Sequence, residues 1–227
     1  MGKTTFAAKS PNPLILDFEA GTLSVRDFDL AVSNPRTIDA VIKTIKKAER
    51  AGISTMIIDS ETEMARAFMN GIMEDMSAKD PRKDLFSPTL EAWGKLTEQM
   101  RYVVRAARDA QMHTVFVCLE SVDKDETSGF ITYAPALSPK IQSDTCAYVD
   151  IIGRLSMRKD KRVCSFEPSD RQIAKDRSGV LPAQIVSKGK DDPDFSINYI
   201  IRRVETITAG QQPDEIEEGN QAVEPND

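Results

Sequence analysis

Histidine, cysteine and long apolar stretches are scarce in this sequence, and each scarcity excludes a class of protein. The single histidine, His113, cannot supply a multi-histidine zinc site, and Ser-His-Asp hydrolysis is equally disfavoured. The three cysteines, at positions 118, 146 and 164, have no Cys-x-x-Cys spacing, which is typical of free thiols in a reducing compartment. No apolar stretch approaches the roughly 18 residues of a membrane span, and no secretion leader is recognisable. We therefore expect a cytoplasmic protein without a membrane partner.

Basic residues are absent from the C-terminal end, where acidic residues are concentrated. Residues 211–227 contain six acids, no lysine or arginine, and few large apolar side chains. We therefore predict a disordered acidic tail over residues 209–227, after a folded domain over residues 1–208. Removing the six tail acids from the 36 in the chain leaves 30, which equals the number of lysines and arginines. In this neutral remainder, residues 154–162 hold five basic residues and one acid.

Three continuous apolar stretches alternate with helical patterns in the first half of the chain. The stretches cover residues 14–18, 54–59 and 113–119. Residues 37–52 and 88–110 repeat apolar residues at helical spacing, the second as one stripe from Leu90 and Trp93 to Ala107. Strands that are apolar throughout are typical of a parallel sheet covered by helices on both faces. We therefore predict an α/β fold around a mostly parallel sheet.

The pattern changes after residue 130. The predicted elements are a strand over 131–137, a short helix from Ser138-Pro139 to about residue 148, strands over 149–157 and 162–166, and a final helix over 195–208. The polar turn at residues 159–161 indicates that the last two strands form an antiparallel hairpin. A late hairpin is therefore expected beside the parallel sheet.

The first residues have the order Gly2-Lys3-Thr4-Thr5, which is the second half of the phosphate-binding motif G-x-x-x-x-G-K-[ST]. In this motif Lys3 would place its charge near the β- and γ-phosphates of a nucleotide, and the Thr4 hydroxyl would bind Mg²⁺. Gly2 and Thr5 complete the predicted nucleotide-binding set. We expect the first strand and the glycine-rich half of the loop to precede Met1. Either the start codon then lies further upstream, or the chain is a truncated form that binds nucleotide weakly.

Acidic residues follow each of the three predicted strands. Glu19 follows the first strand, Asp59 ends the second and Glu120 follows the third. Ligands of open parallel sheets bind beyond the carboxyl ends of the strands, so we expect these acids near residues 2–5. Asp59 would then bind Mg²⁺, directly or through water, and Glu19 would orient or deprotonate the water that attacks the γ-phosphate. Taken singly, each acid could instead be a helix N-cap or a solvated loop residue.

This order of features resembles the RecA-type P-loop ATPases. In these proteins the strand after the phosphate-loop helix ends in a catalytic glutamate, which Glu19 matches, and Asp59 matches the Walker B aspartate. The resemblance assigns the γ-phosphate sensor to Glu120, where relatives usually carry an amide. Lys175 and Arg177 are similar to the fingers that reach a neighbouring subunit's nucleotide in hexameric RecA-fold helicases. A solvated turn is the alternative for this last segment.

Six short motifs also occur in an order that is specific when they are taken together. They are Gly-Lys-Thr-Thr-Phe-Ala (2–7), Leu-Asp-Phe-Glu-Ala-Gly (16–21), Ile-Ile-Asp-Ser (57–60), Pro-Ala-Leu-Ser-Pro-Lys (135–140), Asp-Ile-Ile-Gly (150–153) and Ala-Lys-Asp-Arg-Ser-Gly (174–179). Over residues 1–208 they resemble a family of small phage-encoded RecA-like proteins of the AAA type, some of which are single-strand annealing recombinases. The resemblance implies ATP and Mg²⁺ as cofactors, and single-stranded DNA and a single-strand DNA-binding protein as partners. It also implies a ring or filament of identical subunits that acts in phage recombination in the cytoplasm of a bacterial host.

Three functions agree with these observations. The first is a RecA-fold ATPase that promotes annealing or strand exchange of single-stranded DNA. The second is a DNA-annealing module that keeps the fold without nucleotide turnover, and the third is another P-loop motor, for packaging or partitioning. The chain shows no additional nuclease or helical lid domain, which disfavours the third. In the first two, DNA phosphates would be bound by the basic residues Arg158, Lys159, Lys161 and Arg162.

Overall fold

A computed structural model describes residues 2–80, 82, 84–189 and 192–208. The chain divides into two compact units, Gly2–Val149 and the residues from Asp150 onward. The predicted acidic tail lies outside the described residues, and a single domain over residues 1–208 stays a prediction. Within the part of the chain that is described, no helix is long and apolar enough to cross a membrane.

The first unit is built on a four-stranded parallel sheet with the strand order β2-β1-β3-β4. The strands are β1 (Pro13–Asp17), β2 (Ala31–Ser33), β3 (Thr55–Asp59) and β4 (His113–Val117). Every residue of β1 and β3 is buried, as their continuous apolar sequences predict. In the register Asp17 lies opposite Asp59, so the two central strands end side by side.

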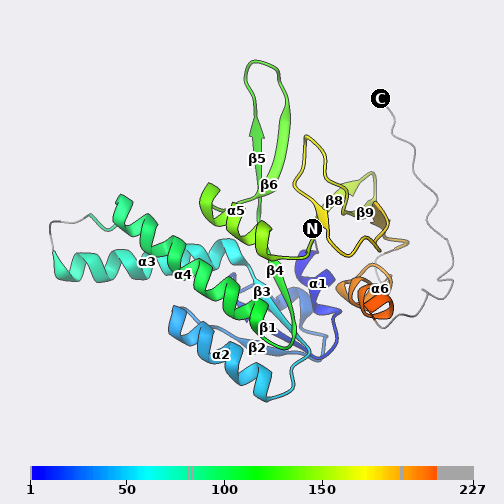
Figure 1. Ribbon diagram of the computed structural model, residues 1–227, viewed down its shortest axis with the longest axis horizontal. Coiled ribbons are helices and arrows are strands. Elements are labelled where there is room, and N and C mark those ends of the chain that lie inside the picture. Colours follow the sequence, from blue (N-terminus) through cyan, green and yellow to red (C-terminus); the bar gives the residue numbers. More distant parts are fainter. Residues whose placement is uncertain (1, 81, 83, 190–191, 209–227) are drawn as a thin grey trace. The chain divides into compact units, whose positions relative to one another are not determined.

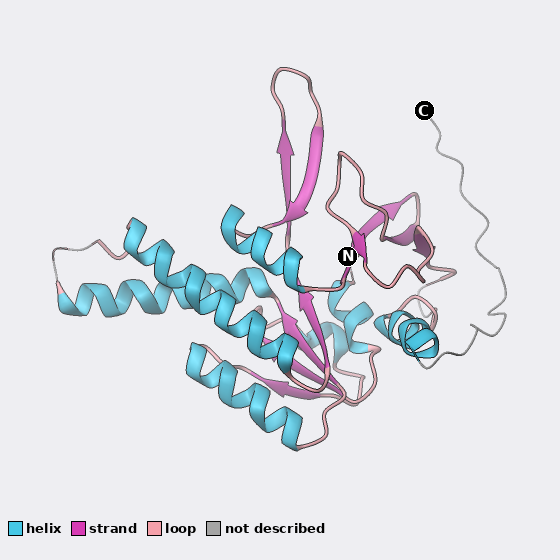
Figure 2. Ribbon diagram, in the orientation of Figure 1, coloured by secondary structure: helices cyan, strands magenta, loops and turns pink. Residues whose placement is uncertain are grey.

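Helices flank this sheet, as Figure 1 and Figure 2 show. They are α1 (Lys3–Ala8), the 3₁₀ helix η1 (Thr22–Val25), α2 (Ile38–Arg50), α3 (Glu61–Lys79), α4 (Leu90–Asp109) and α5 (Pro139–Tyr148). One apolar core joins α2, α3 and α4 to Leu14, Leu16, Met56 and Ile58 of the sheet. Ile15 and Ile57, which alternate with these residues and so face the other way, are also fully buried. The predicted α/β fold with a mostly parallel sheet is confirmed.

Helix α4 is longer than the sheet that it covers. The stripe predicted from the sequence is buried from Leu96 to Ala107, but Leu90 and Trp93 are 91% and 43% exposed. A helix of 20 residues extends about 30 Å, whereas a strand of five residues extends about 17 Å. The predicted apolar stripe is therefore exposed at Leu90 and Trp93, although Ala92 between them is fully buried.

A hairpin that the sequence does not predict connects β4 to α5. Strands β5 (Glu120–Lys124) and β6 (Ile131–Pro135) pair in antiparallel register, and Figure 1 shows them projecting beyond α5. The sequence indicates a strand over 131–137 but gives no signal for β5. All five residues of β5 are exposed and four of them are polar, so neither an apolar stretch nor an alternating pattern marks this strand.

The second unit contains short antiparallel strands and one helix. Its elements are β7 (Ile151–Ile152), β8 (Arg154–Arg158), β9 (Lys161–Ser165), β10 (Lys175–Asp176), β11 (Gln184–Val186) and α6 (Ile197–Thr208). Arg158 pairs with Lys161, which confirms the predicted late hairpin. The predicted strand over 149–157 is divided at Gly153, where a side-chain carbon would lie 2.7 Å from Cys164 Sγ. Glycine therefore permits the close approach at which the chain passes from β7 to β8.

Candidate functional site

A hydroxyl and a carboxylate meet at the carboxyl end of β3. Thr4 Oγ1 donates a hydrogen bond of 2.7 Å to Asp59 Oδ2, across 55 positions of sequence. Thr4 lies in the first turn of α1, and Gly2 before this helix has a φ of 84°, in the left-handed region that favours glycine. Asp59 is the last residue of β3 and is only 4% exposed. The fold thus brings together the two residues that the sequence assigns to one metal site.

The carboxyl end of β1 adds two further acids. Asp17 lies opposite Asp59 in the sheet and is equally buried. Its Oδ1 accepts hydrogen bonds from the backbone N–H groups of Glu19 at 3.1 Å and Gly21 at 3.2 Å. Glu19 itself is exposed, in the loop that these two bonds hold. Sequence reasoning selected Glu19, whereas the structure shows that Asp17 shapes the loop that carries it.

Negative charge accumulates around Asp59. Burial raises the pKa of Asp59, the hydrogen bond from Thr4 lowers it, the carboxylates of Glu19 and Asp17 raise it, and the Lys3 ammonium lowers it. Lys3, Asp17 and Glu19 therefore all lie within electrostatic range of Asp59. A cation bound at this point would favour the ionised form of the carboxylate. The carboxylates would attract a metal ion, and the metal ion together with Lys3 would attract an anionic ligand.

The side chains at this point fit a magnesium ion that is bound with a phosphate chain. Mg²⁺ prefers oxygen ligands and is usually held by one or two protein groups, while phosphates and water complete the octahedron. Thr4 Oγ1 and Asp59 Oδ2, 2.7 Å apart, are such a pair of oxygens. Lys3, one residue before Thr4, adds a positive charge for phosphate oxygens. The arrangement suits a metal ion whose other ligands come from a nucleotide and from water.

A buried polar cluster lies directly after β3. Glu61, the first residue of α3, is fully buried and accepts hydrogen bonds from Thr145 Oγ1 at 2.7 Å and from Cys118 Sγ at 3.3 Å. Burial raises the pKa of Glu61 to about 7, although both hydrogen bonds lower it. Sequence reasoning missed this residue. Its spacing could have indicated burial, because Glu61 lies three residues before Met64 and seven before Phe68, on the buried side of α3.

Glu120, the predicted γ-phosphate sensor, belongs to the hairpin. It is the first residue of β5, where it is exposed and lies opposite Pro135. Cys118 comes directly after β4, and its half-buried thiol lies within electrostatic range of Lys3 and Glu61. Burial raises the pKa of Cys118 well above its ordinary value, so this thiol stays protonated. The sensor role of Glu120 stays a prediction.

The residues predicted to act across a subunit interface lie in the second unit. Lys175 belongs to β10, opposite Ile152 of β7. Arg177 Nη1 lies 2.8 Å from Asp150 Oδ1, and the Arg177 side chain is 56% exposed. The intervening Asp176 accepts hydrogen bonds from the backbone N–H groups of Ser178 and Leu181, so the segment has a fixed turn. A role for Lys175 and Arg177 in a neighbouring subunit stays a prediction.

The predicted DNA-binding residues lie around the tight turn between β8 and β9. We call them the basic hairpin, and they are Arg158, Lys159, Lys161 and Arg162. The first three are exposed and Arg162 is half-buried. Arg158 Nη1 donates a 3.4 Å hydrogen bond to Gln184 of β11. The turn thus concentrates four positive charges, and three of the four side chains are exposed to solvent.

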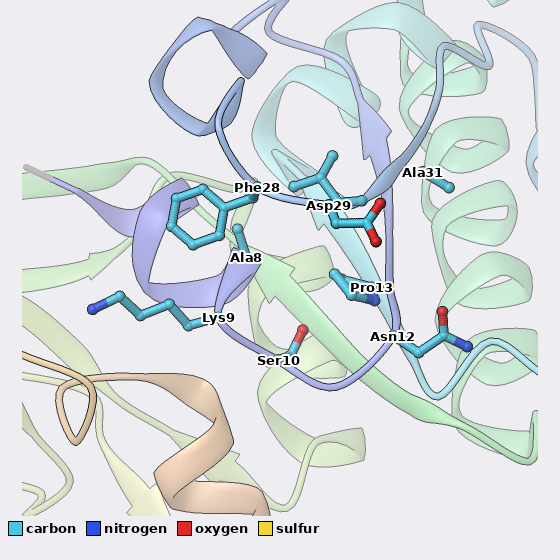
Figure 3. A pocket seen from close by; sticks show the side chains of 9 residues that line it. Ala8, Lys9, Ser10, Asn12, Pro13, Phe28, Asp29 and Ala31 are labelled. Atoms are coloured by element: carbon cyan, nitrogen blue, oxygen red, sulfur yellow. The ribbon is translucent and has the colours of Figure 1, made fainter. Parts of the chain in front are cut away.

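A separate cavity lies at the opposite end of β1. It has a volume of about 650 Å³, and Ser10, Pro13, Phe28 and Asp29 are among its lining residues, which Figure 3 shows. Ser10 Oγ is buried and has no hydrogen-bond partner among the described residues. Pro13 begins β1 whereas Asp17 ends it, so this cavity is distinct from the Thr4–Asp59 pair.

Comparison with known proteins assigns the chain to a family. A search of curated proteins gave no match. A family model described as an AAA domain matches residues 1–178, which include the Thr4–Asp59 pair, Glu19 and the segment of Lys175 and Arg177. The match covers the first unit completely and more than half of the whole chain. This protein therefore belongs to the AAA domain family of P-loop nucleotide-binding proteins.

Proposed function

We propose that this protein binds ATP with Mg²⁺ at the Thr4–Asp59 pair, hydrolyses it, and uses this cycle in annealing or strand exchange of single-stranded DNA. The observation that carries the nucleotide-binding part is the 2.7 Å hydrogen bond between Thr4 and Asp59. Family membership supports nucleotide binding in the same region. The DNA-binding part is supported by the charge of the basic hairpin.

Each side chain of the site has a separate role in nucleotide hydrolysis. Bound Mg²⁺ would neutralise charge on the phosphate oxygens. Lys3 donates hydrogen bonds to the terminal phosphates, while Thr4 and Asp59 hold the metal-binding position. The Glu19 carboxylate, in the loop fixed by Asp17, accepts a proton from the attacking water. Exposure of Glu19 at the loop gives this water access to the carboxylate.

Binding of single-stranded DNA would come from phosphate neutralisation rather than base recognition. Residues 154–162 carry five positive charges and one negative charge, and three side chains of the basic hairpin are exposed. Contacts of this kind are tolerant of sequence and weaken as salt rises, because counterions compete with the protein for phosphates. These are the properties that annealing of arbitrary complementary strands requires. We extend the proposal to phage recombination, with a ring or filament of identical subunits and a single-strand DNA-binding protein as partner.

Replacing all four residues of the basic hairpin by alanine should weaken single-strand binding and flatten its salt dependence. Each phosphate contact contributes about 0.7 to the slope of log affinity against log salt, so four contacts contribute about 3. Fluorescence anisotropy with a labelled oligonucleotide, measured at several salt concentrations, gives this slope.

A matched control removes four exposed positive charges from a different surface. These are Lys43, Lys46, Lys47 and Arg50 of α2, each replaced by alanine. The control should keep the wild-type slope. Equal slopes for the two variants would show that the basic hairpin is not the DNA-binding surface.

A further inference from the structure

The β5–β6 hairpin offers an uncovered surface on the first unit. Among the described strands, β5 and β6 pair only with each other. Every residue of β5 is exposed, as are residues 125–131, which include the turn. A two-stranded ribbon is only marginally stable in water unless another surface covers it. The hairpin projects in Figure 1, and a bound partner would supply the covering surface that stabilises it.

The root of the hairpin is held firmly. The backbone N–H of Leu119 donates to Thr62 Oγ1 at 3.1 Å, and the backbone N–H of Ala136 donates to the Leu119 carbonyl at 2.8 Å. Gln142 Nε2 of α5 donates to the Pro135 carbonyl at 2.7 Å. Both strands are thus anchored at the base of the hairpin. The hairpin is presented to a partner in a defined direction, which lowers the entropic cost of docking.

One face of the hairpin carries apolar side chains together with the charged Glu120 and Lys124. Residues that lie opposite each other in an antiparallel pair share a face, and Val122 lies opposite Tyr133 while Lys124 lies opposite Ile131. Val122 is 59% exposed and Ile131 is 36% exposed. The other face carries Ser121 and Asp123, opposite Ala134 and Thr132. A partner would therefore bury Val122 and Ile131 and meet the charges of Glu120 and Lys124 on the same face.

The charge of the hairpin indicates which kind of partner surface it would bind. Residues 120–135 contain four acids, Glu120, Asp123, Asp125 and Glu126, and one basic residue, Lys124. Hydrogen bonds from the backbone N–H groups of Ser128 and Thr127 lower the pKa of Asp125, so the turn keeps its negative charge. A net charge of −3 repels nucleic acid and favours a basic protein surface that also has apolar side chains.

A surface with this chemistry occurs on the chain itself. Residues 154–162 have a net charge of +4, and within them Met157 is 48% exposed next to the basic hairpin. We propose that the β5–β6 hairpin of one copy docks on the β8–β9 hairpin of a second copy. Because each copy carries both patches, the contact either closes reciprocally as a two-fold dimer or repeats head-to-tail as a ring or filament. This contact does not depend on nucleotide binding, and it covers the basic hairpin, so self-association and the DNA binding proposed above compete for the same residues.

The test uses two charge-reversed forms of the full chain. The first carries Asp123→Lys and Glu126→Lys on β5–β6, and the second carries Lys159→Glu and Lys161→Glu on β8–β9. All four positions are exposed, so both forms should fold, which circular dichroism verifies. Sedimentation velocity at about 50 mM salt, without DNA or nucleotide, measures self-association. Because neither ligand is present, the result is independent of the function proposed above.

The wild type should self-associate, and each altered form alone should associate at least about tenfold more weakly, because the first form places a patch of +1 against +4 and the second places a patch of 0 against −3. An equal mixture should regain association, since the unchanged β5–β6 hairpin of the second form then meets the unchanged β8–β9 hairpin of the first. A control with Glu74→Lys and Asp75→Lys, two exposed acids of α3, should associate like the wild type. The proposal is overturned by a monomeric wild type, by reversed forms that associate normally, or by a mixture no stronger than its components.

Discussion

Replacing Glu19 by glutamine should slow ATP hydrolysis at least about 100-fold while leaving the affinity for Mg·ATP within about threefold of the wild type. Glutamine keeps the size of the side chain but cannot accept a proton from water. Glu19 is exposed in its loop and is not assigned to the metal or the phosphates, so binding should be retained. Steady-state phosphate release gives the rate, and titration with a fluorescent ATP analogue gives the affinity.

Lys3→Ala provides the contrasting variant. Lys3 is assigned to the phosphates, so its loss should abolish detectable binding of Mg·ATP instead of slowing hydrolysis alone. Glu74→Gln, at an exposed position of α3, is the neutral control for Glu19→Gln. Equal loss of affinity in Glu19→Gln and Lys3→Ala would contradict the two separate roles. Full affinity without hydrolysis in the wild type would instead indicate the annealing module without turnover.

Replacing the buried Glu61 by glutamine should stabilise the fold, increasingly so as the pH rises from 5.5 to about 7. The native pKa of Glu61 is about 7, above the ordinary 4.5, so between these values the unfolded chain has lost a proton that the native state keeps. The stability of the wild type therefore falls as pH rises, and this loss ends near pH 7. From pH 5.5 to 7 the wild type loses about 2 kcal/mol of unfolding free energy through this group. Glutamine does not titrate, so the variant does not show this loss.

Urea unfolding with EDTA present measures this difference at each pH. Comparison of the variant with the wild type cancels the contribution of other carboxyl groups, including Asp59, whose pKa is also raised. Glu74→Gln, exposed on the same helix, should follow the wild-type curve within about 0.5 kcal/mol. A constant difference between Glu61→Gln and the wild type across this pH range would show that Glu61 is ionised in the native state throughout.

The parallel sheet was predictable because burial on both faces leaves a direct mark in the sequence. Strands β1 and β3 are apolar at almost every position, and their polar residues lie at the ends. Helix boundaries were also readable where a cap is present: Thr37 accepts a hydrogen bond from the N–H of Ala40, and Gly52 after α2 has a φ of 70°. These local signals do not depend on distant contacts.

The features that the sequence did not predict depend on long-range contacts or on exposure. Strand β5 is polar, because it has no covering layer within the described chain. Glu61 looks like an ordinary acid in a first helical turn, and only the approach of Thr145 and Cys118 makes it a buried hydrogen-bonded group. The pairing of Thr4 with Asp59 was predicted from motif order, but the role of Asp17 required the loop geometry.

The most direct test of the account is the magnesium dependence of nucleotide binding in Asp59→Asn. Asparagine keeps the shape of the side chain but removes the charge on which a bound metal ion depends. Isothermal calorimetry with a non-hydrolysable ATP analogue should give one site in the wild type, with an affinity that falls when EDTA replaces Mg²⁺. In Asp59→Asn this magnesium effect should fall at least about tenfold, whereas Asp75→Asn at an exposed position of α3 should retain it. Absence of binding in the wild type, or an undiminished magnesium effect in Asp59→Asn, would contradict a magnesium-nucleotide site at Thr4 and Asp59.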